Sequence, residues 1–241
     1  MQNKFIYVPT VRHSGTWFLI AFLRSHPIVQ GFVQLENLFT SNFDKEHTVV
    51  FDCPTAKIKE RFTPGGLNVL HNHVCFSTRI ASSVVDAQKG LMASLPSIVP
   101  FRDPLASIVS RYQRHPNQCH LGLAQSWVTF IEFLVSSSSV LNYRAVPLDI
   151  LKSETERRDA LEGVLDHAEI PAKGHAAEWA SQWPLGYNTR GNYALKARYN
   201  AGDVEYIQRT VHEEFKYLQN RRRIVQPFLE SLGYRDLMWW F

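Results

Sequence analysis

Near the start of the chain, the stretch VPTVRHSGTWFLIAFLRSHP (residues 8–27) places a strand, a turn and a helix in direct succession. Residues 4–8 are typical of a strand, and the apolar residues within 15–25 predict a helix. The turn between them contains Arg, His, Ser and Gly. A glycine-containing turn that leads into a helix leaves backbone N–H groups pointing outward at the positive end of the helix dipole. The stretch therefore predicts an anion-binding site.

The rest of the chain continues to alternate strands with helices. Further strands are expected at Leu67–His73, Ser97–Phe101 and 143–148. Helices are expected before Pro96, over 104–115, over 123–135 and from 152 onward. This alternation predicts an α/β fold, a single domain over residues 1–241 with a central parallel sheet flanked by helices. Ligands of such sheets bind at the C-terminal ends of the strands, where the turn at residues 12–16 is expected.

The composition is that of a globular protein with a modest positive charge. Of the 241 residues, 45% are hydrophobic and 20% charged, and the formal net charge is +4. This charge suits an anionic ligand and equally a solvated surface, and no nucleic-acid partner is expected. Arginines 221–223 are expected on the solvent-facing side of one late helix. No apolar run reaches the roughly 20 residues of a membrane helix, and three scattered cysteines agree with a reducing compartment, so a cytoplasmic location is expected.

A second motif, SIVPFRDPLASIVSRYQRH (residues 97–115), is a strand followed by a turn and a helix. Arg102 follows the strand, and Asp103 and Pro104 suit the N-cap and first position of the helix. If this strand neighbours the first one, Arg102 lies beside the first turn, where a guanidinium binds phosphate in a bidentate manner. Ser110 lies about two helical turns further on and could reach the same anion. The alternatives are an ion pair of Arg102 and a bond from Ser110 to its own helix backbone.

The two motifs together resemble those of a known enzyme family. VRHSGTWFL resembles the 5′-phosphosulfate loop of sulfotransferases that use 3′-phosphoadenosine 5′-phosphosulfate (PAPS), and FRDPLASIVSRY resembles their 3′-phosphate motif, with Arg102, Ser110 and Tyr112 in register. Weaker similarity extends over nearly the whole chain. The Walker pattern G-x-x-x-x-G-K-[ST] is absent, which disfavours an ordinary ATP or GTP hydrolase. The resemblance implies a P-loop-NTPase-like sulfotransferase fold and transfer of a sulfonate group from PAPS to a hydroxyl or amine, leaving 3′-phosphoadenosine 5′-phosphate (PAP).

The resemblance also implies roles for individual residues. Ser14, Gly15 and Thr16 would bind the 5′-phosphosulfate. The usual loop lysine or arginine falls on His13, a weaker source of positive charge when neutral, and Arg12 could supply a permanent charge instead. The 3′-phosphate would be bound by Arg102 and Ser110. The adenine-stacking aromatic aligns with Trp17 or Phe18, and a late loop, NTRGNYALK, loosely matches a further 3′-phosphate contact through Arg190 and Gly191.

Two residues compete for the role of general base that sulfonate transfer to a hydroxyl requires. VLHNHVCF (residues 69–76) resembles the strand of cytosolic sulfotransferases that ends at the catalytic histidine, which places that histidine at His73. Glu36 falls where heparan-type sulfotransferases carry a catalytic glutamate. Period-two spacing puts His71, His73 and Cys75 on one strand face. A zinc site is the alternative, but no fourth ligand follows and no metal is expected. For His71 the other interpretation is a buried structural histidine.

The acceptor is not specified by the sequence beyond a small molecule or carbohydrate. Trp179, Trp183 and Tyr187 are expected in a loop, where they could stack on a sugar or a phenol or pack in the core. Two other functions remain open. One is a nucleotide-binding module without catalysis, suggested by the missing loop lysine. The other is a phosphotransferase of the P-loop kinase kind.

Overall fold

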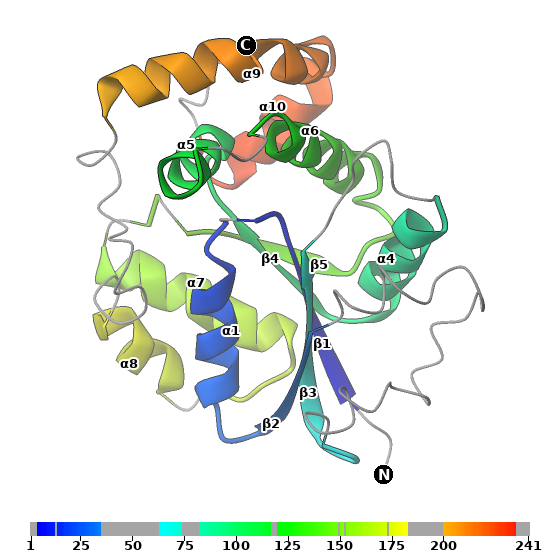
Figure 1. Cartoon of the computed structure of the whole chain (residues 1–241). Helices are drawn as coiled ribbons and strands as arrows, with labels where there is room; N and C mark the ends of the chain where they lie inside the picture. The colour runs from blue at the N-terminus through cyan, green and yellow to red at the C-terminus, as the bar shows by residue number, and fades with distance from the viewer. Residues whose placement is uncertain are drawn as a thin grey trace.

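Five parallel strands form the centre of the molecule. The computed structural model describes residues 4–12, 14–34, 63–73, 82–116, 120–148, 150–151, 153–172, 174–182 and 200–234. The strands lie in the order β2-β3-β1-β4-β5 (Figure 1). Their bounds are β1 (Lys4–Thr10), β2 (Val29–Gln34), β3 (Leu67–His73), β4 (Ser97–Phe101) and β5 (Tyr143–Pro147). This confirms the expected α/β fold with a parallel sheet.

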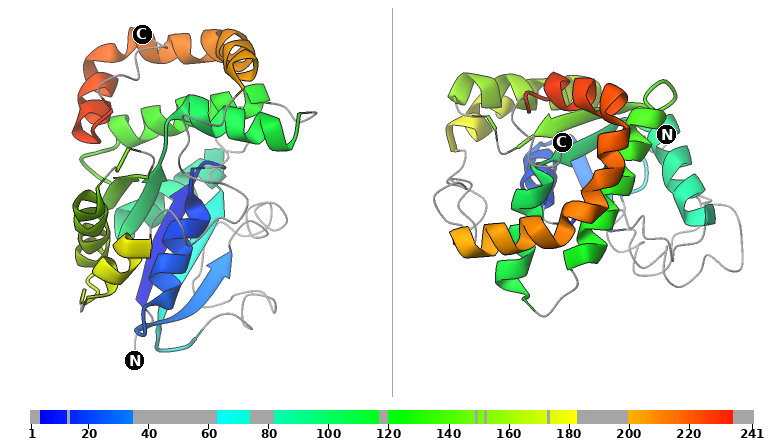
Figure 2. Two further views of the ribbon diagram at one scale, coloured as in Figure 1. Left: turned by 90° about the vertical axis from the view of Figure 1, so that its left-hand side faces the viewer. Right: turned by 90° about the horizontal axis from the view of Figure 1, so that it is seen from above.

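Helices cover both faces of the sheet. The chain forms α1 (Thr16–Ser25), α4 (Ser82–Ser94), α5 (Pro104–Arg114), α6 (His120–Ser136), α7 (Glu154–His167), α8 (His175–Gln182), α9 (Ala201–Asn220) and α10 (Arg222–Ser231). Residues of α1, α7 and α8 share one hydrophobic core, and residues of α4, α5, α6, α9 and α10 share the other. Seen from above, α9 crosses α5 and α6 (Figure 2). In the part of the chain that is described, no helix is long and apolar enough to cross a membrane.

Strand β1 lies between the two cores because its side chains alternate between them. Ile6 and Val8 join the core with α1, whereas Tyr7 joins the core with α5 and α6. The strand is buried from Ile6 to its end at Thr10. Burial on both faces explains the continuous apolar run that leads into the turn.

The strand order places a topological switch point at one end of the sheet. Strands β1 and β4 are neighbours, and the helices that follow them, α1 and α5, pack into opposite cores. Such a switch point, where connections leave to opposite faces, is where open parallel sheets bind ligands. The condition on which the placement of Arg102 depended, that the two motif-bearing strands are neighbours, is therefore met.

Several elements differ from the sequence-based expectations. Strand β2 was not expected: it lies at the sheet edge, contains Gly31, and shifts register between Val29 and Gly31, which weakens its alternation. The loop assignment of Trp179 was wrong, because this residue lies in α8 and packs between α8 and α1. The arginines 221–223 span the junction of α9 and α10 rather than one helix, and the Arg221 guanidinium forms a 2.8 Å ion pair with Glu132 on α6.

Candidate functional site

The turn that joins β1 to α1 has the backbone conformation that an anion-binding loop needs. Gly15 has a left-handed φ of 91°, which a glycine adopts without strain. The Ser14 N–H donates to the Val11 carbonyl at 3.3 Å, and the Phe18 N–H donates to the Gly15 carbonyl at 3.1 Å. The chain therefore turns within four residues and enters the helix at Thr16.

The start of α1 presents unused hydrogen-bond donors. Gly15 is the N-cap and supplies no side-chain hydrogen bond to the helix. No described residue accepts a hydrogen bond from the backbone N–H of Gly15, Thr16 or Trp17. The hydroxyls of Ser14 and Thr16 are buried beside these groups, with their oxygens 3.5 Å apart. Together with the positive end of the helix dipole, these donors suit a phosphate or sulfate group.

Arg102 lies level with this turn on the neighbouring strand. Tyr7 of β1 pairs with Ser97 of β4, and Arg12 and Arg102 each come five residues later, just beyond the ends of these strands. The Arg102 side chain is only 5% exposed. Asp103 caps α5 by accepting a 2.8 Å hydrogen bond from the Leu105 N–H, as expected. Arg102, a buried residue, thus follows β4 at the switch point, next to the strand that leads into the turn.

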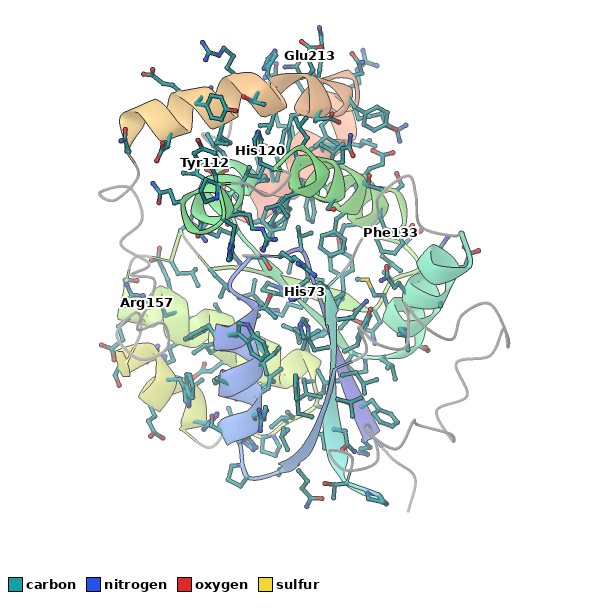
Figure 3. All side chains as sticks on the ribbon, viewed as in Figure 1. His73, Tyr112, His120, Phe133, Arg157 and Glu213 are labelled. Atoms are coloured by element: carbon teal, nitrogen blue, oxygen red, sulfur yellow. The ribbon has the colours of Figure 1, made fainter. Side chains whose placement is uncertain are left out.

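A side-chain hydrogen bond joins helix α5 to the turn. The Ser107 hydroxyl, fully buried, donates to the Arg12 carbonyl at 3.0 Å. Ser110 and Arg111 lie three and four residues further along α5, so they share the helix side of Ser107. Tyr112 packs instead on His120 and Tyr206, with ring centroids 5.8 Å and 5.5 Å away (Figure 3). The side of α5 that bears Ser110 therefore faces the turn.

His73 lies at the end of β3, beside the end of β1 (Figure 3). Its Nδ1 is 3.1 Å from the hydroxyl oxygen of Thr10, its partner in the sheet register, and Thr10 is fully buried. The contact turns the other ring nitrogen, Nε2, away from Thr10. On the opposite face of the sheet, the Tyr7 hydroxyl donates to Asn72 Oδ1, and burial raises the pKa of Tyr7. Side-chain contacts on both faces of the sheet thus join β1 and β3.

His71 has the environment of a structural histidine. It is fully buried, and its Nδ1 donates to the Val8 carbonyl at 2.9 Å, since a carbonyl can only accept. Its ring meets that of His73 edge-on, with centroids 4.9 Å apart. Cys75 lies outside the described residues, and no group of three potential metal ligands occurs among those that are described.

Removing the Thr10 hydroxyl should disturb His73 without changing the shape of the strand. In Thr10→Val, His73 Nδ1 loses a buried hydrogen-bond partner, which we expect to cost about 1–3 kcal/mol of unfolding free energy. We also expect the ¹⁵N shifts of the two His73 ring nitrogens to show a changed tautomer balance. Thr10→Ser, which keeps the hydroxyl, is the matched control. Identical ¹⁵N shifts in the valine variant would show that Thr10 does not orient the ring.

The two aromatic residues after the turn point to different sides of α1. The Trp17 ring is 50% exposed and lies 6.1 Å from the ring of His71, on the side of β3. Phe18 is buried and meets the ring of Trp179 edge-on at 5.8 Å, on the side of α8. Phe18 is therefore part of the hydrophobic core beside α8, and of the two only Trp17 is exposed.

The described residues hold only part of the set expected from the sequence. Arg12, Ser14, Gly15, Thr16, Arg102 and Ser110 gather at one end of the sheet, with His73 at the end of the next strand. The other expected residues, His13, Glu36, Arg190 and Gly191, lie outside the described residues. Sequence reasoning missed Thr10, Ser107 and Arg111. Of these, only Arg111 carried a signal, as a cation one turn beyond Ser107 in the same motif.

Comparison with known proteins gives a likeness of fold. No family model matches the sequence, and no curated protein matches it significantly. Among solved structures, the chain is similar to mouse sulfotransferase SULT7A1 complexed with PAP, with a TM-score of 0.51 and 13% sequence identity. The match covers 90% of this chain and 85% of that one. The chain thus has a sulfotransferase-like fold.

Proposed function

We propose that the protein is a PAPS-dependent sulfotransferase that transfers a sulfonate group to a hydroxyl or amine of a small-molecule or carbohydrate acceptor. The observation that carries the proposal is the adjacency of two anion-binding features. The donor-lined turn at Ser14–Thr16 and the buried Arg102 follow neighbouring strands at the same end of the sheet. The fold shared with a sulfotransferase that was crystallised with PAP supports the same conclusion. We also propose that residues 1–241 form one sulfotransferase-like domain.

The donors at this end of the sheet suit a nucleotide with anionic groups at both ends. The backbone N–H groups at the start of α1 would bind the 5′-phosphosulfate, together with the hydroxyls of Ser14 and Thr16. Arg102 and Ser110 would bind the 3′-phosphate, and Arg190 and Gly191 would add to that site. A guanidinium that is almost fully buried binds phosphate strongly, because little water competes for it. Binding at the 3′-phosphate would distinguish PAPS from ATP.

The reaction requires a general base and groups that stabilise the negative charge developing on the leaving phosphate. His73 Nε2, or the carboxylate of Glu36, would take the proton of the acceptor as the acceptor oxygen or nitrogen bonds to sulfur. The bond between sulfur and the 5′-phosphate oxygen breaks in line, and PAP leaves. His13 would donate a hydrogen bond to that oxygen, while the N–H groups of the turn stabilise the charge that develops on the leaving phosphate. Thr10, through Nδ1, would keep the His73 ring in position.

Thermal unfolding with different nucleotides tests the cofactor assignment. A ligand that binds the folded state raises its stability by mass action, so PAP should raise the unfolding temperature at concentrations where ATP with magnesium does not. A larger shift with ATP and magnesium would favour a phosphotransferase. If neither nucleotide changed the unfolding temperature, that result would contradict the proposal.

Radiolabelled PAPS then tests the chemistry. Transfer of label to at least one member of a panel of sugars, phenols, amines and lipids is expected, and His73→Ala or Glu36→Ala should remove it, depending on which residue is the base. Tight PAP binding with no transfer to any acceptor would favour the nucleotide-binding module, for which the histidine at position 13 is the specific argument.

A further inference from the structure

Two arginines from different elements lie close together beside the turn. Arg12 belongs to the turn itself, and its carbonyl accepts the hydrogen bond from Ser107 on α5. Arg111 lies four residues after Ser107, one helical turn along the same side of α5. The fold therefore brings these two residues beside the same turn from positions about 100 residues apart in sequence.

The electrostatics agree with this placement. Partial burial and the positive charge of Arg12 lower the pKa of Arg111. Arg12 is exposed, and none of the ion pairs among the described residues involves it. Two like charges held near each other repel, and an anion bound between them would turn that repulsion into attraction.

We propose that Arg12 and Arg111 form a two-arginine clamp for a tetrahedral oxyanion, the sulfonate or a phosphate group of the nucleotide. That the oxyanion belongs to a nucleotide rests on the function proposed above; the clamp itself rests only on the placement of the two arginines. Guanidinium groups suit this ligand because their N–H groups match two oxygens of a sulfate or phosphate at once. The clamp is separate from Arg102, which follows β4 and is buried.

The clamp would also compensate for the histidine at position 13. A turn whose lysine or arginine is replaced by histidine has no permanent cation at that position when the imidazole is neutral. Arg12 is adjacent in the chain, and Arg111 reaches the same turn from α5. Their charges persist over the whole physiological pH range, because guanidinium groups do not deprotonate there.

Single glutamine substitutions at the two arginines test the clamp. Arg12→Gln and Arg111→Gln should each weaken PAP binding about 5- to 30-fold, less than loss of a buried charge contact, because Arg12 is exposed and Arg111 is only partly buried. The combined variant should lose less than the product of the two single losses, because both arginines act on one anion. Arg209→Gln, an exposed arginine on α9, is the matched control.

A second ligand separates this proposal from the proposed function. Thermal unfolding in sodium sulfate should show a smaller shift in both arginine variants than in the wild type, while the general stabilising effect of sulfate is the same in all of them. If sulfate raises the unfolding temperature in a way that depends on the two arginines, but PAP does not bind, the clamp is supported and the proposed sulfotransferase function is contradicted. Normal binding of PAP and sulfate by both variants, or equal losses in Arg209→Gln, would overturn the clamp.

Discussion

Arg102→Met should lower the affinity for PAP by about 100-fold or more, the size expected for a buried charge-assisted contact to phosphate. The substitution keeps an unbranched apolar side chain of similar reach, so the packing of the buried stem is largely preserved. The effect should be specific to the 3′-phosphate. Adenosine 5′-phosphate, which lacks that group, should bind the variant and the wild type alike. Calorimetric titration of both nucleotides measures the difference.

Two further variants give this experiment its controls. Arg102→Lys keeps the charge but not the two-pronged geometry, so about a tenfold loss is expected. Arg209→Met removes an exposed charge on α9 far along the chain and should leave PAP binding unchanged. Equal weakening of PAP and adenosine 5′-phosphate by Arg102→Met would mean that Arg102 does not bind the 3′-phosphate.

Gly15→Ala should destabilise the protein and impair nucleotide binding together. The left-handed φ of 91° costs a non-glycine residue about 1–2 kcal/mol. A Cβ at this position would also lie 2.5 Å from Cδ1 of Leu148, a buried residue of the core next to α1. We expect a fall in unfolding temperature of about 3–10 °C, and weaker PAP binding because the N–H groups of the turn change direction.

The two causes of this effect can be separated. Leu148→Ala removes the clash but not the backbone strain, so a double-variant cycle should show a coupling between the two sites of about 0.5–3 kcal/mol. Gly90→Ala is the matched control. Gly90 lies in α4, where an added methyl group would have no neighbour within 4 Å, and alanine there should raise stability by about 0.5–1 kcal/mol. A Gly15→Ala variant as stable as Gly90→Ala would refute the steric and conformational argument.

Local signals in the sequence were sufficient for much of the fold. Strands β3 and β4 begin and end where the apolar runs predicted, and α5 begins at the Asp-Pro pair that suits its N-terminus. Strand β2 and helix α8 escaped prediction. The first is a short edge strand with a glycine and a bulge, and the second is a single helix of eight residues. In both, packing against neighbours outweighs the weak local preference.

The candidate site likewise combines features that local sequence predicts with contacts that it does not predict. The turn at Ser14–Thr16 and the placement of Arg102 after a strand are local features, so the sequence predicted both. The contact of Thr10 with His73 and that of Ser107 with Arg12 join residues that lie 63 and 95 positions apart. They depend on which strands are neighbours, which no local pattern specifies.

By itself, therefore, the sequence determined that this chain alternates strands with helices, and that a glycine-containing turn follows one strand and an arginine follows another, because turn chemistry and periodicity act over a few residues. Only the tertiary structure decided that β1 lies between β3 and β4, and hence that His73, Arg102 and Arg111 approach the same turn. The physical reason is that strand order is set by burying both faces of the sheet at once, an energy that belongs to the whole core.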